Sequence, residues 1–184
     1  VYPGATEEIC IPLIEKHSGL TIGEHFYCGY SPERVNPGDK KHKLNNIIKV
    51  TSGCCPFSAE LIDNLYLNII DAGTHKAESI KVAEAAKVIE NTQRDLNIAL
   101  MNEIFIVCKR LNIDFKNVIK LASTKWNFLK FNPGLVGGHC LPVDPYYFAF
   151  LAKKNKIKTN IILSGRHVNN FMKNFFISEI KKKN

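Results

Sequence analysis

The chain lacks several patterns that would place it directly in a functional class. There is no G-x-G-x-x-G, so a dinucleotide-binding domain here would be missing its first βαβ unit. There is no C-x-x-C pair, and the only adjacent cysteines suit neither a zinc site nor an ordinary disulfide framework, so we expect no metal. No apolar run approaches the roughly 18 residues of a membrane span and no signal peptide is evident, so we expect no membrane partner.

The cysteines lie mostly in apolar stretches, which favours reduced thiols in a cytoplasmic protein. They are Cys10, Cys28, Cys54, Cys55, Cys108 and Cys140. The sequence has no initiator methionine and opens on Val-Tyr-Pro-Gly (residues 1–4), which is typical of a strand entering a turn. We therefore expect these residues to be a segment of a longer protein.

Composition and charge describe a globular chain with a basic surface. Its 184 residues fit one domain or parts of two, and 45% hydrophobic residues are enough for a core. Lys and Arg outnumber Asp and Glu by 25 to 17, and much of the excess lies in runs at 40–43, 153–154 and 181–183. We expect a solvated basic face, with anionic ligands such as phosphates as the second interpretation. No nucleic-acid partner is expected, because no binding motif interleaves with these runs.

Residues 1–72 alternate between helical and extended patterns, which predicts the α/β fold class. Thr6 is expected to cap a first helix, and a second helix is expected at 58–70. Strands are expected at 26–30 and 47–51. Because helices separate the strands, the predicted sheet is parallel, and these residues form the trailing part of it.

A long helix dominates the middle of the sequence, which has no glycine or proline between residues 74 and 132. The helical pattern at 79–111 is apolar on most sides and about 45–50 Å long. Such a helix needs cover from a second domain or subunit, so we expect a domain-connecting helix with a homodimer interface. Further helices are expected at 114–123, at 144–154 and after Gly165.

The loop expected at 124–143 contains the most informative stretch, Gly-Gly-His-Cys (residues 137–140). The two glycines would let a substrate carbonyl approach the bare backbone beside Cys140 and meet main-chain N–H donors. Asp144 followed by Pro145 predicts an N-cap, which would place Cys140 just ahead of a helix N-terminus that favours the thiolate. This segment alone leaves two interpretations of Cys140 open: a nucleophile, or an incidental buried cysteine in a glycine turn before a helix.

Two further groups have chemical potential. Lys87 and Asn91 lie one turn apart on one face of the long helix. In one interpretation the lysine forms an ion pair with Glu84 or Glu90, or extends to solvent. In the other, the cation and the amide point together into a cleft, where they stabilise an oxyanion or hold a water. The Ser-Pro-Glu-Arg turn (residues 31–34) ends an expected strand, where binding crevices form, although a solvated Glu–Arg pair is the common outcome.

Together these motifs resemble the UDP-glucose/GDP-mannose dehydrogenase family. The matching stretches occur in the family's order, with compatible spacing, at residues 1–4, 31–34, 83–92 and 137–140. The Gly-Gly-His-Cys form and the stretch at 31–39 are most similar to UDP-N-acetylhexosamine 6-dehydrogenases of capsule and O-antigen synthesis.

The resemblance implies three regions. They are the trailing part of a Rossmann-like NAD-binding domain at 1–75, an all-α central domain with a dimerisation helix at 76–160, and the start of a linker to a UDP-binding domain at 161–184.

The implied reaction is the oxidation of the C6 alcohol of UDP-GlcNAc or UDP-GalNAc to a carboxylate with two NAD molecules. By this resemblance Cys140 would capture the aldehyde as a thiohemiacetal, which a second oxidation turns into a thioester. Lys87 would stabilise the oxyanion, and Asn91 would place the reacting group or water. Asp144 would assist hydrolysis, and Glu33 matches the acidic residue of the turn at the strand end.

The resemblance also implies residues that contact the substrate and the cofactor. The UDP-sugar contacts are Glu33, Arg34, Val35, Lys87, Asn91, Phe131, Gly134, Gly137 and Arg166. Cys140 and Val143 are implied to contact NAD, whose glycine loop lies outside the sequence. We therefore expect the 184 residues alone to be inactive.

Other interpretations remain. A second acidic residue of UDP-glucose enzymes is Pro37 here, which separates this chain from a UDP-glucose 6-dehydrogenase without excluding it. A non-catalytic dimerisation fragment is the second alternative. A Cys–His hydrolase with His139 as base is disfavoured, because neighbouring residues in an extended turn point their side chains apart.

Overall fold

The computed structural model describes residues 1–36 and 38–182. Pro37 and the last two residues, which include the end of the C-terminal lysine run, lie outside the described residues. The chain divides into two compact units, Val1–Ile89 and Glu90–Asn184, and the boundary falls inside the longest helix.

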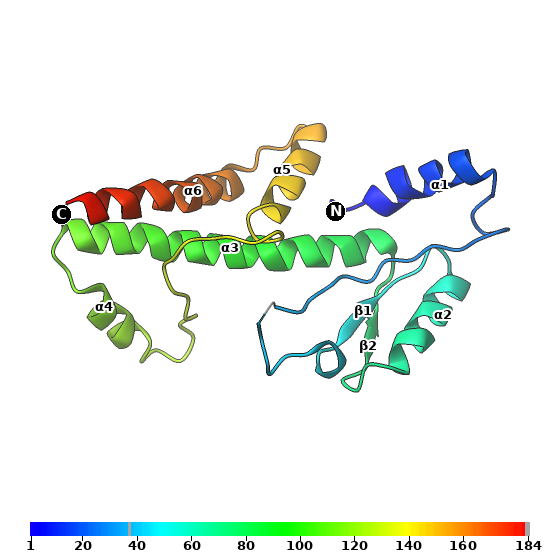
Figure 1. The fold of residues 1–184 in the computed structure, drawn as a ribbon, viewed down its shortest axis with the longest axis horizontal. Coiled ribbons are helices and arrows are strands. Elements are labelled where there is room, and N and C mark those ends of the chain that lie inside the picture. The colour runs from blue at the N-terminus through cyan, green and yellow to red at the C-terminus, as the bar shows by residue number, and fades with distance from the viewer. Residues whose placement is uncertain (37, 183–184) are drawn as a thin grey trace. The chain divides into compact units, whose positions relative to one another are not determined.

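The first unit contains a small parallel sheet. Strand β1 (Lys49–Thr51) pairs with β2 (Thr74–Lys76), with Lys49 opposite Thr74. Helix α2 (Pro56–Leu67) connects the two strands and packs beside them, as parallel strands require (Figure 1). The parallel arrangement, β1 and α2 confirm the predictions; β2 was not predicted, because its three residues are half-buried or exposed and show no apolar alternation.

The strand expected at 26–30 is wrong. Within the described residues this stretch makes only isolated bridges, of which one pairs Gly29 with Gly53 in antiparallel orientation. Pro32 follows shortly after and has no amide hydrogen with which to extend a ladder.

The chain begins with a π-helical turn, η1 (Thr6–Cys10), that leads into helix α1 (Ile11–Ser18). The expected cap at Thr6 is wrong, because the N-cap residue is Ala5 and makes no side-chain bond. The hydroxyl of Thr6 instead donates to Glu84 Oε1 at 2.6 Å, a long-range contact that the local sequence does not reveal.

Helix α3 (Ile80–Arg110) is continuous over 31 residues, which confirms the helix predicted at 79–111 (Figure 1). It is buried along one side at Ile80, Val88 and Met101. It also carries apolar side chains that the described residues leave about half exposed: Val82, Ile89, Leu100 and Val107. The apolar surface of this helix is therefore larger than the described residues cover.

The described residues of the second unit contain helices and no strand. Helix α4 (Phe115–Ala122) is capped by Asp114, whose carboxylate accepts from the amides of Lys116 and Asn117. Helices α5 (Asp144–Lys154) and α6 (Asn160–Lys181) complete the unit. The helices predicted at 114–123 and 144–154 are thus confirmed.

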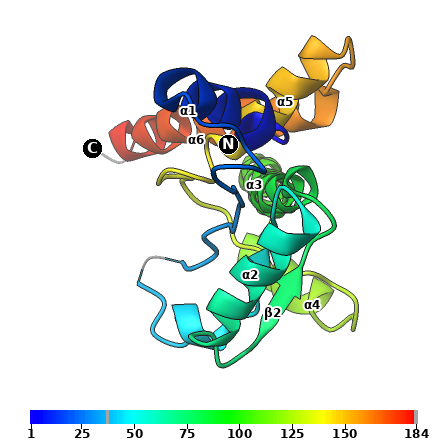
Figure 2. The same ribbon diagram turned by 90° about the vertical axis from the view of Figure 1, so that its right-hand side faces the viewer.

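Helix α6 runs along the second half of α3 (Figure 1, Figure 2). The helices approach closely at Gly165, where an added Cβ would lie 2.3 Å from Leu96 Cδ2. α6 begins at Asn160, earlier than the pattern after Gly165 indicated. Among the described residues, no helix has the length and apolar content to cross a bilayer.

Candidate active site

The Ser-Pro-Glu-Arg turn of the first unit is held by lysines that bind consecutive main-chain carbonyls. Lys49 Nζ donates to Pro32 O at 2.8 Å, and Lys87 Nζ donates to Glu33 O at 2.5 Å. Ser31 Oγ donates to Val50 O on β1 at 2.6 Å. The structure therefore brings two of the predicted motifs, the turn and Lys87, into direct contact.

Lys49 was not predicted as part of this site. Its side chain is buried, and its ammonium lies 5.2 Å from the centre of the Tyr66 ring. Burial lowers the pKa of Lys49, which the nearby Glu33 carboxylate partly offsets. The sequence did contain a signal for Lys49: it is a lysine inside an apolar strand pattern, where a buried charged group needs a partner.

The ion pair considered for Lys87 with Glu84 is not what the structure shows. The Glu84 carboxylate is fully buried and accepts from Gly4 N, Thr6 N and the Thr6 hydroxyl. Lys87 is half-buried and reaches the turn instead. The Glu33 side chain is exposed and accepts from the amide of Val35, which leaves its carboxylate at the surface of the same turn.

The cysteine loop of the second unit leads directly into α5. The carbonyl of Cys140 accepts from Val143 N at 3.1 Å and from Asp144 N at 2.8 Å, so it closes the first turn of the helix. The Cys140 side chain is half-buried. Gly138 has a φ of +87°, a conformation that favours glycine, and within the described residues a Cβ there would meet no atom within 4 Å. The position predicted for Cys140, ahead of a helix N-terminus, is confirmed.

The N-cap role expected for Asp144 is wrong. The N-cap residue is Val143, and Asp144 is the first residue of α5. The Asp144 carboxylate is buried and accepts from Asn91 Nδ2 at 2.6 Å. Two predicted site residues from distant parts of the sequence therefore meet four residues beyond the cysteine.

Arg166 is almost completely buried, with 3% of its surface exposed. Its guanidinium donates to Asp95 Oδ1 at 2.6 Å and to Asn170 Oδ1 at 2.8 Å. The substrate contact implied for Arg166 stays a prediction. The guanidinium Nε and the second oxygen of Asp95 have no partner among the described residues, so this ion pair is buried and incompletely bonded.

The remaining predicted residues occupy surface or half-buried positions. Arg34 donates to Ile48 O at 3.2 Å, and Gly134 bonds to the side chain of Asn102. Phe131 is half-buried, whereas Gly137 and Val143 are exposed. His139 is exposed too.

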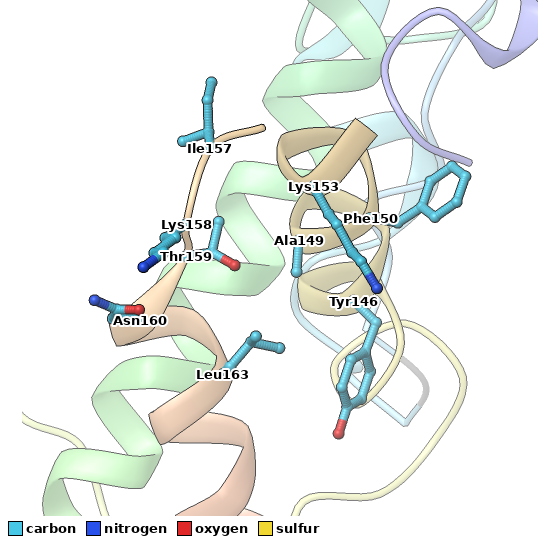
Figure 3. A pocket seen from close by; sticks show the side chains of 9 residues that line it. All are labelled: Tyr146, Ala149, Phe150, Lys153, Ile157, Lys158, Thr159, Asn160 and Leu163. Carbon is cyan, nitrogen blue, oxygen red and sulfur yellow. The ribbon is translucent and has the colours of Figure 1, made fainter. Parts of the chain in front are cut away.

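Two of the pockets formed by the described residues lie in the second unit. One, of about 440 Å³, is formed by α5, the following connection and α6, with Tyr146, Phe150 and Lys153 on its wall (Figure 3). None of the predicted site residues lines it. The other, of about 580 Å³, lies between the end of α3 and the start of α4, and the loop residues Asn132 and Pro133 close one side.

All six cysteines are free thiols. Burial raises the pKa of Cys28, and hydrogen bonds from Ser58 lower that of Cys55. No cluster of three or more potential metal ligands was found in the described residues.

Residues 81–171 match the central domain of the UDP-glucose/GDP-mannose dehydrogenase family. Together with relatives that are 55–60% identical over 99% of its length, this match shows that the chain belongs to that family.

The chain is similar to individual relatives over nearly its whole length. The UDP-N-acetyl-D-glucosamine 6-dehydrogenase of Pseudomonas aeruginosa is 60% identical over 99% of this chain and 43% of that protein. Protein CapL of Staphylococcus aureus is 55% identical over the same shares. The solved structure of UDP-D-ManNAc dehydrogenase from Pyrococcus horikoshii superposes with a TM-score of 0.87 at 32% identity, over 99% of this chain and 43% of that one. The chain thus spans less than half the length of the curated relatives that it matches.

Proposed function

We propose that this chain forms the central part of a UDP-N-acetylhexosamine 6-dehydrogenase, which oxidises the sugar's C6 alcohol to a carboxylate for polysaccharide synthesis. The observation that carries the proposal is the buried contact between Asn91 and Asp144 at the start of α5, four residues after Cys140. The 59% and 60% identities to two UDP-N-acetyl-D-glucosamine 6-dehydrogenases support the choice of substrate class.

In this proposal Cys140 is the nucleophile. Its sulfur adds to the C6 aldehyde, forming a thiohemiacetal whose oxidation gives a thioester. Water then attacks the thioester carbonyl, the C–S bond breaks, and the carboxylate and the thiol are released. Asp144 holds the Asn91 amide in one orientation, so that the pair places this water or the reacting oxygen.

The same proposal gives roles to Lys87 and the Glu33 turn of the first unit. The Lys87 ammonium stabilises the oxyanion that develops on C6. Its bond to Glu33 O fixes it beside the turn, whose exposed carboxylate faces solvent. The UDP-sugar contacts of Arg34, Val35, Phe131, Gly134, Gly137 and Arg166 belong to the same proposal.

NAD is the proposed oxidant and supplies a two-electron acceptor for each oxidation step when bound. In this proposal the described residues hold only part of the cofactor, because the sequence around the small β1–β2 sheet contains no glycine-rich phosphate loop. Cys140 and Val143 are proposed to contact only its nicotinamide end. We accordingly propose that residues 1–75 are the trailing part of a Rossmann-like domain and that the complete protein supplies the rest.

The test uses the complete protein that contains this chain. Incubation with NAD and UDP-GlcNAc or UDP-GalNAc should yield two NADH per uronic acid formed. Replacement of Cys140 by Ser should abolish acid formation, since a hydroxyl lacks an accessible anionic form. Cys108→Ser provides the control, because this thiol is buried on α3 and is not part of the loop that carries Cys140. Acid formation by Cys140→Ser at the normal rate would rule out covalent catalysis by this residue.

A further inference from the structure

A buried side-chain amide on the long helix α3 binds the loop that precedes Cys140, at Gly134. Asn102, on α3, is fully buried. Its Oδ1 accepts from Gly134 N at 2.8 Å, and its Nδ2 donates to Gly134 O at 3.0 Å. Since both bonds go to one residue, they fix the position and the direction of the main chain at Gly134, as a neighbouring strand would.

The loop has little else to hold it. Residues 128–137 form no helix or strand. Among the described residues, the main chain of 129–139 makes no hydrogen bond other than the two to Asn102. Asn132 and Pro133, immediately before the tether, form part of the wall of the 580 Å³ pocket. The cysteine follows six residues after Gly134.

A second layer of buried groups sets the orientation of the Asn102 amide. Asn102 Nδ2 also donates to Asn169 Oδ1 on α6 at 2.8 Å. Asn169 Nδ2 in turn donates to Asp95 O at 3.0 Å and to Asp95 Oδ1 at 2.8 Å, and Arg166 donates to the same carboxylate. An inverted Asn102 amide would place NH₂ against the Gly134 N–H and an oxygen against the Asn169 oxygen. The chain of donors therefore allows one orientation.

We propose that Asn102 is a positioning residue for the substrate loop at 131–137, held in register by Asn169, Asp95 and Arg166. This inference rests on the proposed function, because it assigns the loop to the UDP-sugar. It also gives the Arg166–Asp95 ion pair a role in positioning this loop. The loop is placed by α3 and α6, so it does not have to be ordered by the ligand alone.

The test compares Asn102→Ala with Asn97→Ala in the complete protein. Asn97 is on the same helix, and among the described residues its side chain bonds only to the carbonyl of Gln93 within that helix. Hydrogen exchange at the Gly134 amide should be about tenfold faster in Asn102→Ala, as expected for the loss of a hydrogen bond, and unchanged in Asn97→Ala. KM for the UDP-sugar should rise by a similar factor, with a smaller change in kcat. A merely structural role would lower the active fraction, and so kcat, without moving KM.

Unchanged exchange at Gly134 in a folded Asn102→Ala protein would overturn the inference, and so would faster exchange with an unchanged KM. Should Asn102→Ala fail to fold, Asn169→Ala decides. It removes the orienting partner and leaves the Gly134 bonds possible, so Gly134 exchange should still rise; unchanged exchange would overturn the proposal. Failure of the proposed function appears separately, as a lack of NAD reduction by the unsubstituted protein.

Discussion

Lys87 bonds to a main-chain carbonyl of the Ser-Pro-Glu-Arg turn, so the lysine could serve either catalysis or the structure of the turn. A substitution that removes its charge distinguishes the two roles. Lys87→Met keeps most of the volume of the side chain and removes the charge. If the ammonium stabilises the oxyanion, kcat of the complete enzyme should fall by about 10²–10³. The fold and UDP-sugar binding should be retained, which circular dichroism and calorimetric titration can measure.

The matched control is Lys81→Met on the same helix. Lys81 is more than half exposed and pairs with Glu8 at 3.6 Å, so its removal should change neither kcat nor the melting temperature appreciably. If Lys87 only anchored the turn at Glu33, Lys87→Met would lower the melting temperature and leave kcat nearly intact. That result would end the catalytic assignment of Lys87.

Single residues differed in how well the sequence predicted them. The position of Cys140 ahead of a helix was predicted from the following helix start, which is a local pattern. The contact between Asn91 and Asp144 was not foreseen, because the two positions are 53 apart and meet only through packing. Asn102 was missed for the same reason, since an asparagine inside a helical pattern gives no sign of the loop that it binds.

At the scale of elements, α3 leads to a prediction about association. Leu100 and Val107 are 53% and 49% exposed on a helix that already buries another side. We expect these apolar side chains to lie in a homodimer interface, whose formation depends on apolar burial. The unsubstituted protein should sediment as a dimer at micromolar concentration, and Leu100→Glu should shift it toward the monomer.

Leu121→Glu on α4 is the control for that change. Leu121 is 71% exposed, so it receives the same substitution at an exposed apolar position outside α3. The mass of Leu121→Glu should equal that of the unsubstituted protein. A monomer for the folded unsubstituted protein, or equal effects of the two substitutions, would contradict an interface on α3.

Helices were predicted more accurately than strands, for a physical reason. The extent of α3 follows from apolar periodicity over a stretch without proline or glycine, and the start of α5 follows from Asp144 and Pro145, all of which are local signals. The strand expected at 26–30 had the apolar composition of a strand, yet among the described residues it makes only isolated bridges, at Phe26 and Gly29. Strand formation depends on a partner, and the sequence of one segment does not show whether its partner can continue the ladder.

At the scale of the whole molecule, the absence of a phosphate-binding glycine loop gives a direct prediction. The 184-residue chain should bind NAD too weakly to detect at millimolar cofactor, whereas the complete protein should bind it. Isothermal titration measures both, and helical circular dichroism of the shorter chain serves as the control for folding. Tight NAD binding by the helical 184-residue chain would contradict the proposed division of the cofactor site.

Glu84 provides the N-terminal cap of η1 from a position 78 residues away from Thr6. This arrangement restricts which sequence changes the protein can accept together. Serine at position 6 keeps the donor, whereas valine has a similar shape but removes one of the three bonds to a buried carboxylate. A loss of the hydroxyl at position 6 is therefore tolerated best when position 84 also loses its charge, so the two positions are expected to vary as a pair among functional homologues.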